Sequence, residues 1–170
     1  DHHLTLVDGK TITPSSNYSM SDFSSWGVTP DLRLKPEVAA PGGSIYSAVL
    51  DGKYDHLSGT SMATPQMAGV STVVLQRVQN DPLFASMSAR EKVDVVQNLI
   101  MGTARPLVDA AQTTGAFYSP RKQGSGLVDA VAATTSSVYP TVVGAAEQSR
   151  PQAALGAGTT GWNFEVFLHT

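Results

Sequence analysis

The chain has 170 residues, a formal net charge of −3 and no cysteine. Its hydrophobic fraction of 41% is sufficient for the core of one ordinary globular domain. No basic run is long enough to follow a phosphate backbone, so the composition argues against nucleic-acid binding. The absence of cysteine excludes disulfides and thiolate sites. A membrane-spanning helix is not expected, because Gly69, Ser71 and Thr72 interrupt the longest apolar helical stretch.

The first part of the chain predicts short strands. Residues 4–13 alternate loosely between apolar and polar side chains around an Asp-Gly pair, which favours a hairpin, although a surface loop fits equally well. The apolar runs at residues 38–40 and 45–50 predict two short buried strands. A second Asp-Gly pair then predicts a hairpin turn, after which residues 53–57 return.

Helices are predicted in the middle of the chain. The first is marked by apolar residues at helical spacing, namely Met67, Val70, Val74, Leu75 and Val78. Because its other sides are also small or apolar, we expect this helix to be buried. Ser88 and Glu91 form a capping box for a second helix of about residues 89–101, with Gly102 as its stop. Residues 126–133 suggest a last short helix.

The C-terminal part has the pattern of strands. Residues 138–143 and 162–168 are rich in apolar residues at strand spacing and are separated by several glycines. Trp162, Phe164 and Val166 share one face of the second strand. We interpret this face as the core of a β domain and not as a platform for substrate.

Residues 57–65 contain a serine between a glycine-bearing turn and the start of the first helix. Backbone N–H groups at a helix N-terminus have no intrahelical partner and can stabilise a developing oxyanion. Gly59 allows a sharp turn beside the serine. The alternative is an ordinary helix start, with Thr60 or Ser61 as the N-cap residue.

The longer string Gly-Thr-Ser-Met-Ala-x-Pro resembles the nucleophile signature of the subtilisin-like serine proteases, the subtilases. The resemblance places Ser61 at the nucleophile position. It assigns the nucleophile turn and helix start to Gly59, Thr60, Met62 and Pro65. Subtilases commonly have a histidine directly after the proline, where this chain has Gln66, but that position is not catalytic in the family.

The resemblance extends over about residues 20–135. Residues 24–27 and 35–42 look like the segment that leads into the subtilase nucleophile. Residues 118–130 resemble the end of the catalytic domain and indicate a narrower group, the Gram-positive cell-envelope proteinases, which include the lactocepins and the C5a peptidases.

The resemblance also implies what this chain lacks. Subtilases carry their triad in the order Asp, His, Ser, and no Asp-Ser/Thr-Gly or His-Gly string precedes Ser61 here. The asparagine of the family's oxyanion hole also lies upstream of the matched region. We therefore expect a C-terminal part of a catalytic domain that belongs to a longer protein. His56 is a poor substitute base, because a strand residue just before the nucleophile usually points elsewhere.

The fold class implied is α/β: the C-terminal portion of a subtilisin-like parallel-sheet domain, followed by the first strands of a fibronectin-III-like β-sandwich. Residues 1–15 would be the exit of an inserted domain or a return strand. Residues 16–136 would be the catalytic part, and residues 137–170 the start of the β domain.

The function implied is serine endopeptidase chemistry on protein or peptide substrates, with the rest of the catalytic domain as the necessary partner. This chemistry requires no metal or organic cofactor. Family members often bind structural calcium, but the sequence offers no acidic cluster to name as a site. We expect a secreted or cell-wall-attached protein of a Gram-positive bacterium. A catalytically degenerate surface-binding module is the alternative. A non-peptidase serine hydrolase is disfavoured because the Gly-x-Ser-x-Gly pattern is only half matched.

Overall fold

The computed structural model describes residues 4–5, 11–12, 18–31, 33–143, 151 and 165–170, and the account below concerns these residues. The elements, in chain order, are β1 (Leu4–Thr5), β2 (Thr11–Ile12), β3 (Ile45–Ala48), η1 (Leu50–Gly52), β4 (Tyr54–Leu57), α1 (Thr60–Asn80), η2 (Pro82–Phe84), α2 (Ala89–Thr103), α3 (Pro120–Gln123), α4 (Ala130–Thr135), β5 (Tyr139–Val143) and β6 (Glu165–His169).

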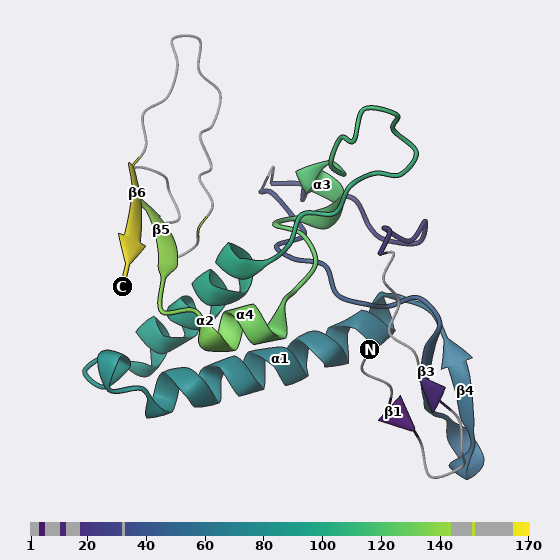
Figure 1. The fold of residues 1–170 in the computed structure, drawn as a ribbon, viewed down its shortest axis with the longest axis horizontal. Coiled ribbons are helices and arrows are strands. Elements are labelled where there is room, and N and C mark those ends of the chain that lie inside the picture. Colours follow the sequence, from purple (N-terminus) through teal and green to yellow (C-terminus); the bar gives the residue numbers. More distant parts are fainter. Residues whose placement is uncertain (1–3, 6–10, 13–17, 32, 144–150, 152–164) are drawn as a thin grey trace.

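Helices form the main packed layer of the molecule. Figure 1 shows α1 running along one side, with α2 and α4 lying on it and β5 next to α2. The core lies where these elements meet. Its buried members are Val74, Val78, Phe84, Val95, Val96, Leu99, Ile100, Ala133 and Tyr139. Val74 and Val78 of α1 are buried in this core, and Met67 and Val70 pack against it from nearer the start of the helix.

The second helix begins at the capping box that the sequence predicts. The Ser88 hydroxyl accepts from the Glu91 N–H, and the Glu91 carboxylate accepts from the Ser88 N–H at 2.7 Å. The expected stop at Gly102 is wrong, since the helix includes Gly102 and ends at Thr103. Pro140 of β5 explains this glycine: a Cβ at position 102 would lie 2.7 Å from the Pro140 Cδ atom.

The described strands form three antiparallel pairs, β1–β2, β3–β4 and β5–β6. The β3–β4 hairpin turns at Asp51 and Gly52, both with positive φ, as the Asp-Gly pair predicts. The β1–β2 pair confirms the strands predicted within residues 4–13, and their turn lies outside the described residues. The mixed helix and strand content is as expected. Within the described residues the expected parallel sheet is represented by a single parallel bridge, between Ala39 and Leu127.

Hydrogen bonds join two segments that are far apart in the sequence, around Gly27 and around Arg121, beside that bridge. The Arg121 guanidinium Nε donates to the Gly27 carbonyl at 2.8 Å, and the Gly27 N–H donates to the Arg121 carbonyl. The Lys122 ammonium lies 5.3 Å from the ring centre of Trp26 and 5.4 Å from that of Tyr118. Both strings that carry the family resemblance on either side of the nucleophile therefore belong to one folded unit.

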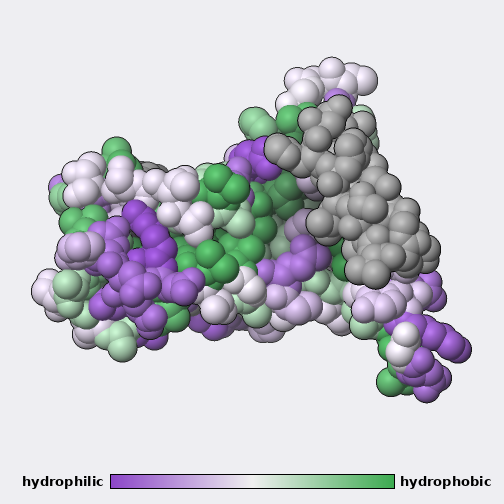
Figure 2. Space-filling model, turned by 60° about the horizontal axis from the view of Figure 1, so that its bottom comes forward, coloured by the Kyte–Doolittle hydropathy of each residue, from purple (hydrophilic) through white to green (hydrophobic). Residues whose placement is uncertain are grey.

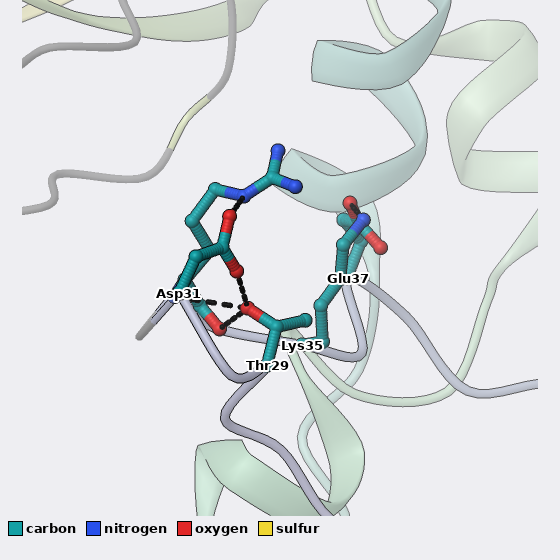
Figure 3. A network of polar contacts seen from close by, with 5 residues as sticks. Thr29, Asp31, Lys35 and Glu37 are labelled. Atoms are coloured by element: carbon teal, nitrogen blue, oxygen red, sulfur yellow. Dashed lines mark hydrogen bonds and ion pairs between the residues drawn. The ribbon is translucent and has the colours of Figure 1, made fainter.

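A local network of polar contacts joins side chains within residues 29–37 (Figure 3). The Thr29 hydroxyl donates to Asp31 at 2.5 Å, and the Arg33 Nε donates to the other carboxylate oxygen of Asp31 at 2.7 Å. Lys35 pairs with Glu37 on the same segment. The Thr29 hydroxyl, followed by Arg33, holds the pKa of Asp31 below its usual value. The network precedes residues 38–40, where the predicted buried strand is wrong: only Ala39 forms a bridge. The strand predicted for residues 45–50 is β3, which ends at Ala48 and is not fully buried.

The expectation of a fully buried first helix is only half met. Val74 and Val78 are fully buried, but Val73 is 54% exposed. Figure 2 shows apolar residues, in green, in the middle of the face that it presents. The reason is geometric: α2 and α4 pack on one side of α1, and no other described element covers its opposite side. Val166 of β6 is likewise 55% exposed, and Trp162 and Phe164 lie outside the described residues.

Candidate active site

Ser61 is the second residue of α1 and is exposed. Gly59 is the N-cap residue, and no side chain caps this end of the helix. The first N–H groups of a helix have no intrahelical acceptor, and Thr60 and Ser61 supply the first two of α1. The alternative interpretation, in which Thr60 or Ser61 is an ordinary N-cap, is wrong because both residues lie inside the helix.

The first turns of α1 are adapted to this exposed end. Pro65 has no N–H and cannot donate to the carbonyl of Ser61, four residues before it. The Thr64 hydroxyl donates to the Thr60 carbonyl at 2.9 Å. The helix therefore tolerates the proline within its second turn, where only one of its backbone bonds is lost.

A short segment, residues 41–44, is hydrogen-bonded at two points to the nucleophile turn and at a third to the following helix. The Gly59 N–H donates to the Gly42 carbonyl at 2.8 Å. The Ser44 N–H donates to the Ser58 hydroxyl oxygen at 2.8 Å. The Gln66 amide Nε2 donates to the Pro41 carbonyl at 2.9 Å. We call residues 41–44 the support segment, because they fix the turn from behind.

Gly42 packs closely against the nucleophile turn and the first helix. A Cβ at position 42 would lie 2.7 Å from the Gly59 carbonyl oxygen and 3.3 Å from the Ala63 Cβ. Real Cβ atoms are essentially never found as close as the first of these distances. The support segment can therefore approach the nucleophile turn closely only with glycine at position 42.

His56 does not hydrogen-bond to Ser61 in the described structure. Its Nδ1 lies 3.2 Å from both the hydroxyl and the carbonyl oxygen of Ser44. Its ring packs 5.0 Å from the ring centre of Tyr46 on the neighbouring strand. Ser44 has a positive φ of 52°, an unusual backbone conformation for serine, and His56 and Ser58 together hold it. His56 thus supports the turn and is not placed as a base.

A hollow of about 560 Å³ lies beside the start of α1. Thr60, Ala63 and Met67 of the helix form part of its wall. The rest comes mainly from residues 18–25 and 36–43. Its lining is largely apolar, which suits packing against another apolar segment better than binding a charged ligand.

The described residues hold no group of three or more His, Cys, Asp or Glu side chains that could bind a metal ion. Among the described residues, the groups whose pKa departs from its usual value are Asp31 in the 29–33 loop, Glu91 at the start of α2 and Tyr139 of strand β5. Among the described helices, none is both long and apolar enough to cross a bilayer.

The five residues singled out in the sequence are near neighbours in the chain, and the structure places them at the N-cap and in the first two turns of α1: Gly59, Thr60, Ser61, Met62 and Pro65. Sequence reasoning missed the contacts that hold them. Gly42 carries a usable signal, because it follows a proline in a string that resembles the family. Ser44, Ser58 and Gln66 carry none, since their bonds join residues up to 25 positions apart.

Comparisons with solved structures identify maturation proteases as neighbours. The patellamide maturation protease PatA has a TM-score of 0.48 and 30% identity, covering 68% of this chain and 37% of that one. The prenylagaramide maturation protease PagA has a TM-score of 0.47 and 27% identity, covering 67% of this chain and 36% of that one.

Sequence comparisons are more specific. The C5a peptidase of Streptococcus pyogenes is 39% identical over 132 residues, 78% of this chain, which spans 11% of that protein's length. The PII-type proteinase of Lactococcus lactis subsp. cremoris is 36% identical over 141 residues, and the chain spans 7% of it. The profile of the subtilase family, Peptidase S8, matches residues 10–126. The chain therefore belongs to the subtilase family, and its relatives include the C5a peptidases and the lactococcal proteinases.

Proposed function

We propose that Ser61 is the nucleophile of a serine endopeptidase whose remaining catalytic groups come from another part of the same protein. The observation that carries this proposal is the position of Ser61. It is exposed at an uncapped helix N-terminus, where three hydrogen bonds join the turn and the following helix to residues 41–44, within a chain of the subtilase family.

The chemistry follows from this position. The Ser61 Oγ attacks the carbonyl carbon of the scissile peptide bond while a histidine base accepts the hydroxyl proton. The Ser61 N–H and an asparagine side chain from upstream donate to the oxyanion. The imidazolium then protonates the leaving amine, which leaves an acyl ester on Ser61. A water molecule, deprotonated by the same histidine, hydrolyses the ester and restores the serine.

The base has to come from outside the described residues. Of the two histidines that the structure describes, His56 bonds to Ser44, and His169 lies at the β5–β6 pair, 2.9 Å from the Thr141 hydroxyl. His2 and His3 lie outside the described residues. A serine without a base is a weak nucleophile near neutral pH. We therefore infer that the 170-residue chain alone is inactive and that an upstream aspartate and histidine complete the site.

The setting of the protein is part of the proposal. Its relatives are named as peptidases and proteinases, and they come from Streptococcus and Lactococcus. They support a protein or peptide substrate and a secreted or cell-surface location in a Gram-positive bacterium. No cofactor is needed for the steps above. Structural calcium elsewhere in the longer protein stays an expectation from the family.

The test uses the longer protein, with its upstream segment, and a serine-directed fluorophosphonate. We expect covalent labelling at Ser61, and we expect Ser61→Ala to abolish both labelling and hydrolysis of a casein substrate. The 170-residue chain alone should not be labelled. A folded longer protein that takes no label would favour the catalytically degenerate binding module instead. Labelling of the short chain, lost in Ser61→Ala, would show that a base lies within it.

A further inference from the structure

We propose that Gln66 is a positioning residue for the nucleophile: its side-chain amide holds the support segment in the place that sets the geometry of the Ser61 turn. This inference rests on the proposed function of Ser61. Gln66 does not touch the reacting atoms, so its effect is transmitted through Pro41 and Gly42.

The first step is the reach of Gln66. It lies five residues after Ser61 on α1, so the two side chains project about 140° apart around the helix axis. Ser61 is exposed on one side of the helix. On another side, the Gln66 amide Nε2 donates to the Pro41 carbonyl oxygen at 2.9 Å. Gln66 is itself half-buried. The helix is thus bound to the support segment on the side away from the nucleophile.

The second step is the connection from Pro41 to the turn. Gly42 follows Pro41 directly, and its carbonyl accepts from the Gly59 N–H at 2.8 Å. Gly59 is the N-cap residue of the helix on which Ser61 lies. A shift of Pro41 therefore moves the Gly42 carbonyl, which orients Gly59. The backbone N–H of Ser61, proposed above to bind the oxyanion, follows two residues later. Small displacements of such groups have large effects on rate.

The third step is the chemistry of the side chain. The Pro41 carbonyl needs a donor, and an amide supplies one. Leucine has a similar size but would leave the half-buried carbonyl without this bond. A glutamate carboxylate would face the carbonyl with an oxygen and could donate only when protonated. Histidine carries a ring N–H that can replace the amide donor.

The fourth step separates this role from general stability. The C-terminal half of α1 is anchored in the core by Val74 and Val78, both fully buried. Val74 lies eight residues, or about 12 Å along the helix, beyond Gln66. Met67, the neighbour of Gln66, also packs against this core, and its contact does not depend on the amide. Loss of the Gln66 bond should therefore loosen the nucleophile turn while Met67, Val74 and Val78 keep their packing.

The experiment compares Gln66→Leu, Gln66→Glu and Gln66→His in the longer protein. Gln79→Leu, the same change at an exposed position of α1, is the matched control. We expect Gln66→Leu to lower the fluorophosphonate labelling rate roughly five-fold, the loss that one neutral hydrogen bond produces. With a peptide substrate, kcat should fall while KM stays constant. Gln66→His should retain most of the labelling rate of the unsubstituted longer protein (the parent). Gln79→Leu should have the same labelling rate as the parent.

A pH profile adds a second readout. The labelling rate of Gln66→Glu, divided by that of the parent at each pH, should rise as the pH falls, because protonation turns the carboxyl into a donor. A ratio that does not change with pH would count against the role of the hydrogen bond.

Amide hydrogen exchange tests the positioning without any activity. In Gln66→Leu the Gly59 N–H should exchange faster, while the amides of α2 keep their protection. If the parent takes no label, the proposed function fails, and the exchange measurement still decides the role of Gln66. Unchanged labelling and unchanged Gly59 exchange in Gln66→Leu would overturn the inference. So would an equal loss in Gln79→Leu.

Discussion

A single methyl group at position 42 would collide with the nucleophile turn. The Cβ of an alanine there would lie 2.7 Å from the Gly59 carbonyl oxygen, which is backbone and cannot move aside cheaply. We expect Gly42→Ala to destabilise the fold by about 1–3 kcal/mol, the usual range for overpacking. In the longer protein, labelling at Ser61 should fall more than stability does, because the strain lies at the turn. Denaturant unfolding and the labelling rate, measured on the same preparation, check both effects.

At the level of residues, the sequence offers a candidate nucleophile but not the contacts that hold it. Ser61 is a candidate because glycine, serine and proline occur together in one contiguous string before an apolar helix. The bond from Gln66 to Pro41 joins residues 25 positions apart. Such a contact depends on how the chain folds back, and no local pattern indicates it. The same holds for Ser44, whose positive φ is maintained by Ser58 and His56 from the other side of the hairpin.

At the level of elements, α2 shows what local chemistry can and cannot decide. Its start was predictable because a capping box is a contact between residues three apart. Its end was not, because Gly102 is a packing contact for Pro140 and not a terminator. A glycine inside a helix usually costs stability. Here it allows β5 to cross the helix closely, a reason that lies 38 residues further along the chain.

The start of α2 also gives a pH-dependent prediction. The Ser88 hydroxyl and then the Ser88 backbone N–H hold the pKa of Glu91 below its usual value. A carboxyl group with a lowered folded-state pKa contributes stability above its unfolded pKa, and this contribution is lost as the pH falls through the folded-state value. Ser88→Ala should therefore lower the Tm at neutral pH, by roughly 2–4 °C.

The difference in Tm between Ser88→Ala and the parent should then shrink as the solution is acidified through the range of Glu91. Calorimetric scans at several pH values would measure it. If the difference in Tm stays constant at all acidic pH values at which the protein is folded, the Ser88 hydroxyl contributes only by accepting from the Glu91 N–H. Its bond to the Glu91 carboxylate would then add no stability.

At the level of the whole molecule, the sequence predicts neighbours that the described residues do not include. The expected parallel sheet is reduced to one parallel bridge, Ala39 with Leu127. The apolar composition of α1 suits a helix with neighbours on all sides. Among the described elements, α2 and α4 cover only one side of it. The domain boundaries near residues 15 and 136 and the fibronectin-III-like sandwich stay predictions, since a single pair of strands, β5 and β6, is too little to define a sandwich.

Gly69 on the open side of α1 makes the missing neighbours testable. Apart from its chain neighbours and the backbone of its own helix, no atom of the described residues lies within 4 Å of the place where its Cβ would be. In the 170-residue chain, Gly69→Ala should therefore stabilise the fold by about 1 kcal/mol, the difference in helix propensity between the two residues. If the rest of the catalytic domain packs on this side in the longer protein, the added methyl group meets a close-packed interface, and the same substitution should be destabilising there. Denaturant unfolding of both proteins, with and without the substitution, measures the two signs. Stabilisation of equal size in both would mean that this side of α1 stays exposed, and the proposal that an upstream segment completes the domain around α1 would fail.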